Sequence, residues 1–91
     1  MGIENFISDR KVVEDMLDKR DCSDQACELF ISVAKQAEQI VATNINKPGY
    51  TPADMKAFLI TIYNGVKRYA IQKRNTEMVK EYNTKIATLE N

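Results

Sequence analysis

The segment from Tyr50 to Ala70 carries the clearest structural signal in the chain, a helix start followed by a regular apolar pattern. Thr51 can cap a helix, Pro52 suits the first helical position, and Asp54 stands where a capping box needs an acceptor. Beyond this start, apolar residues recur at alternating steps of four and three, at Met55, Leu59, Ile62, Val66 and Tyr69. The spacing predicts a helix over about 52–72 with one apolar face, which another element must cover.

A second pattern of the same kind precedes it. Ser23 can start a helix with Asp24 in its first turn, where negative charge favours the helix dipole. The helix predicted over about 24–44 ends near Asn44, since the sequence NINKPG cannot continue it. The connection is short, so the two helices are expected to form an antiparallel hairpin. Its facing seams are predicted to serve helix packing or self-association through Phe30, Val33, Ala37, Ile40, Val41, Met55, Leu59, Ile62, Val66 and Tyr69.

Two further helices are predicted at the ends of the chain. The first is short, about 9–19, with Ser8 as a candidate cap and a narrow apolar face. The last, about 76–89, carries an apolar seam that resumes at Met78 after the polar sequence QKRNTE. Either Asn75 or Thr76 caps a separate helix that folds back, or one helix continues from Pro52 and exposes its seam to another chain. The predicted fold is therefore all-α, a single domain of residues 1–91 built as a small bundle of three to four helices.

Charge and composition restrict the function. The 91 residues have a net charge of zero and 44% of them are hydrophobic, which is typical of a folded domain. No apolar run approaches the ~20 residues of a membrane span, so we expect a cytoplasmic protein. Residues 1–25 carry a net charge of −3 and residues 51–91 a net charge of +3. The two ends should attract each other, either within one chain or head to tail between chains.

The inventory of reactive side chains argues against catalysis. Histidine is absent, and two cysteines, Cys22 and Cys27, do not supply the four ligands of a structural zinc site. Cys27 is interpreted as a small core residue. The three aspartates Asp18, Asp21 and Asp24 lack the ligand spacing of a calcium-binding EF-hand. We therefore expect no enzyme, no metal and no cofactor.

Basic and aromatic residues on the helix over 52–72 form the candidate binding site. Lys56, Lys67 and Arg74 are separated by nearly whole numbers of helical turns, and Tyr63 falls along the same line. Such a stripe suits an acidic protein surface, a nucleotide or another small anion, or a nucleic-acid backbone, although no nucleic-acid recognition motif is present. The predicted contact residues are Lys56, Tyr63, Lys67, Arg68, Lys73 and Arg74.

The sequence from Ile40 to Val66, IVATNINKPGYTPADMKAFLITIYNGV, resembles the amino-terminal segment of the MucR/Ros family of bacterial regulators. In that family a helix ending in an isoleucine-valine pair leads through an asparagine-containing turn to a proline and a second helix. The matching positions, with a one-residue gap, are Ile40 and Val41, Asn44 or Asn46, Pro52, Met55, Ala57, Leu59, Ile62 and Val66. The resemblance implies self-association through this segment. The zinc finger of the family is missing, so its DNA binding does not carry over.

These patterns predict a small non-catalytic regulatory or interaction protein, of bacterial or phage type. It would form a homo-oligomer, a dimer or larger, and bind or occlude a macromolecular partner, expected to be a protein, through its helix faces. The alternative is an oligomer that sequesters a nucleotide or other small anion at a basic, tyrosine-lined interface. A third hypothesis is an accessory nucleic-acid-binding protein.

Overall fold

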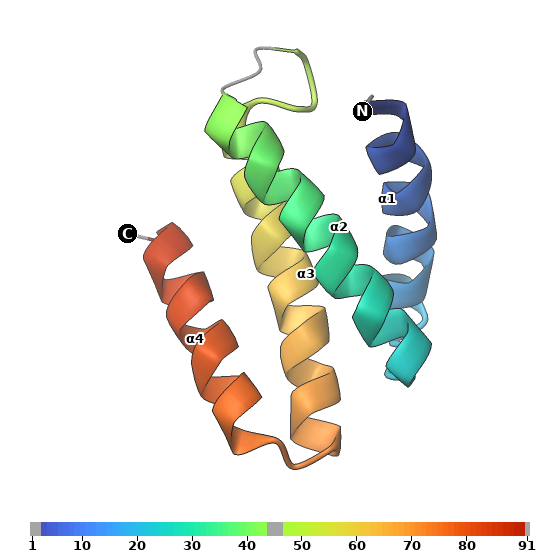
Figure 1. Cartoon of the computed structure of the whole chain (residues 1–91), viewed down its shortest axis with the longest axis vertical. Helices are drawn as coiled ribbons and strands as arrows, with labels where there is room; N and C mark the ends of the chain where they lie inside the picture. Colours follow the sequence, from blue (N-terminus) through green and yellow to red (C-terminus); the bar gives the residue numbers. More distant parts are fainter. Residues whose placement is uncertain (1–2, 44–46, 91) are drawn as a thin grey trace.

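The structure is a computed structural model that describes residues 3–43 and 47–90 (Figure 1). This part of the chain forms four helices, α1 (Ile3–Asp18), α2 (Asp24–Thr43), α3 (Pro52–Gln72) and α4 (Thr76–Glu90), and no strands. The predicted all-α fold, a small bundle of three to four helices built on an antiparallel hairpin, is confirmed. Asn44 and Asn46, which the resemblance uses, lie outside the described residues.

The start of α3 has the predicted geometry. The Thr51 hydroxyl accepts a hydrogen bond from the backbone N–H of Asp54, and the Asp54 side chain accepts one from the backbone N–H of Thr51. Two N–H groups that no helical carbonyl can reach are thereby satisfied, and Pro52 removes the need for a third. Gly49, at φ +84°, turns the chain just before this cap, in a backbone conformation that glycine adopts without strain.

The start of α2 also follows the prediction. The Ser23 hydroxyl accepts from the backbone N–H of Ala26, and Asp21 accepts from the backbone N–H of Ser23. Cys27 is buried, as expected for a core residue, and the low-dielectric surroundings raise the pKa of its thiol. Desolvation and nearby carboxylates both favour the neutral thiol, so Cys27 is not an activated nucleophile.

The antiparallel pair of α2 and α3 forms the centre of the core. The predicted seam residues pack within the chain: each of the following is at most 9% exposed, Phe30, Val33, Ala37, Ile40, Met55, Leu59, Ile62 and Val66. Val41 and Tyr69 are half-buried at its edge. Ala26, Ala34 and Ala37 on α2 have no bulk beyond Cβ, which allows the two helices to approach closely.

Helix α1 differs from its prediction. It begins at Ile3 rather than near Asp9, and Ser8 lies inside it instead of capping it. The reason is Phe6, which is 2% exposed and makes edge-to-face contacts with Phe58 and Tyr50, at ring-centroid distances of 5.8 and 6.2 Å. These tertiary contacts stabilise a first turn whose local sequence contains no strong start signal.

Helices α3 and α4 are separate, which settles the alternative that the sequence left open. Arg74 adopts a left-handed conformation at φ 57°, its N–H bonds to the carbonyl of Ile71, and the N–H of Asn75 bonds to the carbonyl of Ala70. This is a Schellman motif, a common end of a helix. Asn75 then caps α4 by accepting from the backbone N–H of Met78 at 3.2 Å.

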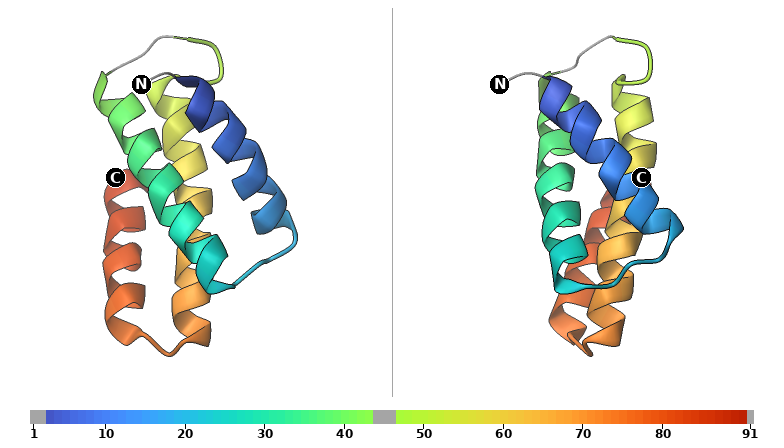
Figure 2. Two further views of the ribbon diagram at one scale, coloured as in Figure 1. Left: turned by 45° about the vertical axis from the view of Figure 1, so that its right-hand side comes forward. Right: turned by 90° about the vertical axis from the view of Figure 1, so that its right-hand side faces the viewer.

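Helix α3 is the central element of the molecule. Helices α1 and α4 lie on opposite sides of it, and α2 packs across it, as both views of Figure 2 show. In the described part of the chain α4 packs on α3 and makes no backbone approach to α1. One ion pair among the described residues joins the acidic first part of the chain to the basic last part, between Lys73 and Asp24 at 3.8 Å.

Candidate functional site

The structure separates the six predicted contact residues into three groups. Lys56 is exposed near the start of α3, far along the helix from the others. Tyr63 is 4% exposed, so it is a core residue and not a surface contact. The remaining four basic residues, Lys67, Arg68, Lys73 and Arg74, lie at the carboxyl end of α3.

Tyr63 belongs to a polar and aromatic cluster that joins three helices. Its hydroxyl donates to the carboxylate of Glu38 on α2, and its ring packs edge-to-face on Tyr82 of α4, with centroids 5.5 Å apart. The Lys85 ammonium lies 3.9 Å from the Glu38 carboxylate and over both rings. Burial, followed by the hydrogen bond to Glu38, raises the pKa of Tyr63, and burial raises the pKa of Tyr82. Both tyrosines remain protonated over the physiological range, and the cluster holds α4 against α2 and α3.

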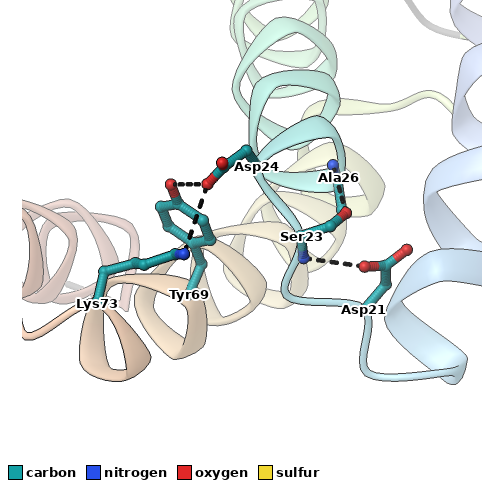
Figure 3. A network of polar contacts seen from close by, with 6 residues as sticks. All are labelled: Asp21, Ser23, Asp24, Ala26, Tyr69 and Lys73. Atoms are coloured by element: carbon teal, nitrogen blue, oxygen red, sulfur yellow. Dashed lines mark hydrogen bonds and ion pairs between the residues drawn. The ribbon is translucent and has the colours of Figure 1, made fainter.

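Lys73 is likewise engaged within the chain. Figure 3 shows its ammonium near the carboxylate of Asp24, which also accepts a hydrogen bond from the Tyr69 hydroxyl at 2.6 Å. The ammonium lies 5.8 Å from the centre of the Tyr69 ring. The hydrogen bond to Asp24 raises the pKa of Tyr69 to about 12. These contacts connect the end of α3 to the start of α2, so Lys73 and Tyr69 have a structural role in this conformation.

A surface with a different character lies at the turn between α3 and α4. Ile71 is 58% exposed, and over residues 6–43 and 47–90 the only other large hydrophobic side chain exposed is Val12 on α1. Beside Ile71 is an almost wholly apolar crevice of about 430 Å³, lined by Ala70, Ile71, Arg74, Asn75, Thr76, Val79 and Lys80. Arg68 and Lys67 stand one turn before Ile71, and both are half-exposed. We call Arg68, Ile71, Arg74, Val79 and Lys80 the turn surface.

The turn surface unites part of the predicted stripe with residues that sequence reasoning did not assign to it. Arg68 and Arg74 were predicted contacts, whereas Val79 and Lys80 come from α4 and reach Arg74 only because the chain reverses at Asn75. A signal was present in the sequence, since an asparagine cap after Arg74 implies that α4 returns along α3. Exposed apolar area surrounded by arginine and lysine is typical of protein-binding surfaces.

The groove between α1 and α3 is less suited to a ligand. A cavity of about 380 Å³ there is lined by Arg10, Glu14 and Phe58 among others. The guanidinium of Arg10 stacks over Phe58 at 4.7 Å and pairs with Glu14 at 3.7 Å. Arg10 thus already covers the apolar ring and neutralises the nearest carboxylate.

The described residues lack a cluster of metal-ligating side chains. They contain no group of three or more histidine, cysteine, aspartate or glutamate side chains close enough to hold a metal ion. Every described side-chain nitrogen or oxygen that is fully buried has a hydrogen-bond partner, so none is left aimed at a missing ligand. None of the helices between residues 3 and 90 is both long enough and apolar enough to cross a membrane.

The segment for which a resemblance to the MucR/Ros family is predicted, residues 40–66, contributes the end of α2 and most of α3. Its apolar residues Ile40, Met55, Leu59, Ile62 and Val66 are buried inside the chain. Searches of protein-family models, of curated protein sequences and of solved structures found no match to this chain.

Proposed function

We propose that this chain is a small non-catalytic interaction protein that self-associates and binds a protein partner through the turn surface. The observation that carries the proposal is the exposed Ile71 beside an apolar crevice that Arg74 and Lys80 also line, with Arg68 one turn before Ile71. An apolar centre supplies affinity through burial, and a basic rim selects acidic partners and orients them. The occupant that fits is an acidic helix presenting one or two apolar side chains.

The mechanism is occlusion. A bound helix would cover Ile71 and fill the crevice between the end of α3 and the start of α4, so that the partner's own apolar face is no longer available to other molecules. This activity requires no bond to be made or broken. A binding role of this kind is consistent with the buried tyrosines and the buried cysteine, because their raised pKa values keep these side chains neutral.

The alternative of a small anion held by bases and tyrosines has less support. Tyr63 is buried and donates to Glu38, and Tyr69 donates to Asp24, so neither hydroxyl is directed at the turn surface. Arg74 and Lys80 line an almost wholly apolar crevice and not a polar pocket. Apolar area in the middle of the site favours a protein partner over a phosphate group.

The experiment that tests self-association is the mass in solution, measured by light scattering behind size exclusion from about 10 μM to 1 mM. We expect the mass to rise above 10.4 kDa as the concentration increases. A mass that stays at 10.4 kDa up to 1 mM would refute self-association.

A second measurement addresses the class of ligand. ATP and a 20-nucleotide single-stranded DNA are titrated into ¹⁵N-labelled protein, and the amide signals of Ile71 and Arg74 are followed. We expect no saturable shift with either probe at physiological salt, because the turn surface is centred on apolar side chains. Saturable ATP binding there would replace the proposal with anion sequestration, and DNA binding that weakens steeply with salt would replace it with nucleic-acid binding.

A further inference from the structure

Val12 and Ile71, two large hydrophobic residues that are exposed, have neighbours of opposite charge. Val12 on α1 is 47% exposed, and the positions three residues before and after it are Asp9 and Asp15. Ile71 is 58% exposed, and the positions three residues before and after it are Arg68 and Arg74. Side chains three residues apart are neighbours on a helix surface. Val12 therefore stands between two acidic residues on α1, whereas Ile71 lies one turn after Arg68 and lines the same crevice as Arg74, which belongs to the turn that ends α3.

The two sets have the same spacing along the sequence. From Asp9 to Asp15 is six residues of helix, or about 9 Å along the axis. Arg68 and Arg74 are separated by the same number of residues, although the last of these belongs to the turn that ends α3. An aspartate carboxylate accepts two parallel hydrogen bonds from an arginine guanidinium, so each pair can form with good geometry once the apolar side chains meet.

The fold keeps these two faces apart within one molecule. Helix α1 lies on the opposite side of α3 from α4, and the turn surface is formed where α3 meets α4 (Figure 1). The internal partners of the acidic residues are modest: Asp15 pairs with the exposed Lys19 at 3.0 Å, and Asp9 accepts one hydrogen bond from Gln36 at 3.4 Å. An exposed ion pair of this kind contributes little and is easily exchanged for another.

We infer that a second copy of this chain docks on the turn surface, with its α1 residues Asp9, Val12 and Asp15 against Arg68, Ile71 and Arg74. The inference rests on the proposed function and names one occupant of its binding surface. The contact joins two different faces. Two bound copies therefore still have one free acidic face and one free basic face between them, and the assembly grows head to tail. The contact area is that of one helix on one turn, which gives weak, reversible and salt-sensitive association.

The test uses the whole chain and three variants. The first, Arg74→Gly, deletes one basic side chain and places glycine at φ 57°, where it is favoured over arginine. Its helices are expected to be at least as stable as those of the original chain, so lost association cannot be ascribed to unfolding. We expect association at least about tenfold weaker. The control is Lys56→Glu on the same helix. It changes an exposed base that lies away from the turn surface, and it should retain association.

The second and third variants each disable one face. Val12→Lys with Asp15→Lys changes the acidic face, and Ile71→Glu with Arg74→Glu changes the basic face. Each variant alone should be a monomer at 1 mM. A mixture of the two should form a complex of one copy of each and nothing larger, since only one intact face of each kind remains.

The outcomes separate this inference from the broader proposal. An original chain that associates, together with a mixture that yields no one-to-one complex or an Arg74→Gly chain that associates undiminished, overturns the head-to-tail contact but leaves self-association standing. A mass that stops rising at the dimer also overturns it, because a contact between different faces does not close at two copies. An original chain that is monomeric at 1 mM overturns both.

Discussion

Replacing Tyr82 with alanine is expected to release α4 while α1, α2 and α3 remain folded. Tyr82 is the only buried side chain of α4, at 6% exposure, and its ring contacts Tyr63 and the Lys85 ammonium. The other apolar residues of this helix, Met78, Val79, Ile86 and Leu89, are half-exposed. Because the backbone of α4 approaches only that of α3 in the described chain, with Lys85 reaching Glu38 on α2, α4 is expected to detach without opening the rest of the core.

The size of the effect follows from the burial. Truncating a buried aromatic side chain to alanine costs about 3–5 kcal/mol. The whole domain, at 91 residues, is expected to have a free energy of unfolding of about 5–14 kcal/mol, of which α4 docking is a part. A loss of about 3 kcal/mol raises the population of the detached state more than about 100-fold. A free helix of 15 residues is barely stable in water, so detached α4 should unfold.

Hydrogen exchange measured by NMR reports the population of the detached state at each backbone amide. The amides of α4 should lose about 100-fold or more in protection, and those of α2 and α3 should change much less. The control is Tyr82→Phe, which keeps the ring and removes a hydroxyl for which the structure shows no hydrogen bond, and it should behave like the original chain.

Equal loss of protection in all four helices would refute the reasoning, because it would mean that α4 unfolds only together with the core. Unchanged protection in α4 would show that its half-exposed residues suffice to hold it, and that the Tyr63–Tyr82 contact contributes little.

Two smaller effects can be measured by urea unfolding and by a pH titration. Thr51→Ala removes the capping hydroxyl of α3 and should lower the free energy of unfolding in urea by about 1 kcal/mol, with Thr51→Ser as the control that restores it; an unchanged urea midpoint would contradict the capping role. The pKa of Tyr69 is raised from its ordinary 10.0 to about 12 by the hydrogen bond to Asp24, so the stabilisation is complete below pH 10 and lost as the pH rises towards 12. Absorbance at 295 nm should show one tyrosine ionising at lower pH in Asp24→Asn than in the original chain, and identical titrations would contradict the role of this bond.

The sequence was informative where the signal is local. The cap at Thr51, the hydroxyl of Ser23 and the apolar spacing along α2 and α3 depend on residues within four positions of one another, and all of them appear in the structure. The all-α fold and its antiparallel hairpin followed from these signals because a helix with one apolar face has to pack that face against a neighbour.

Prediction failed where a distant residue supplies the stabilisation. Phe6 extends α1 towards the amino terminus because it packs on Phe58, more than fifty positions away, and no local pattern shows this. Tyr63 looked like an exposed member of a basic stripe for a similar reason: the side of α3 that carries it is covered by Tyr82 from α4.

The sequence by itself determined the number of helices within a narrow range, their starts at Thr51 and Ser23, and the apolar faces that form the core, since hydrogen-bond capping and helical periodicity act over a single turn or a few turns. Only the tertiary structure decided which charged residues stay available. It paired Lys73 with Asp24 and Lys85 with Glu38, and it left Arg74 beside the exposed Ile71. The physical reason is that exposure depends on how whole helices pack, and the direction that α4 takes after Asn75 sets that packing for the basic end of the molecule.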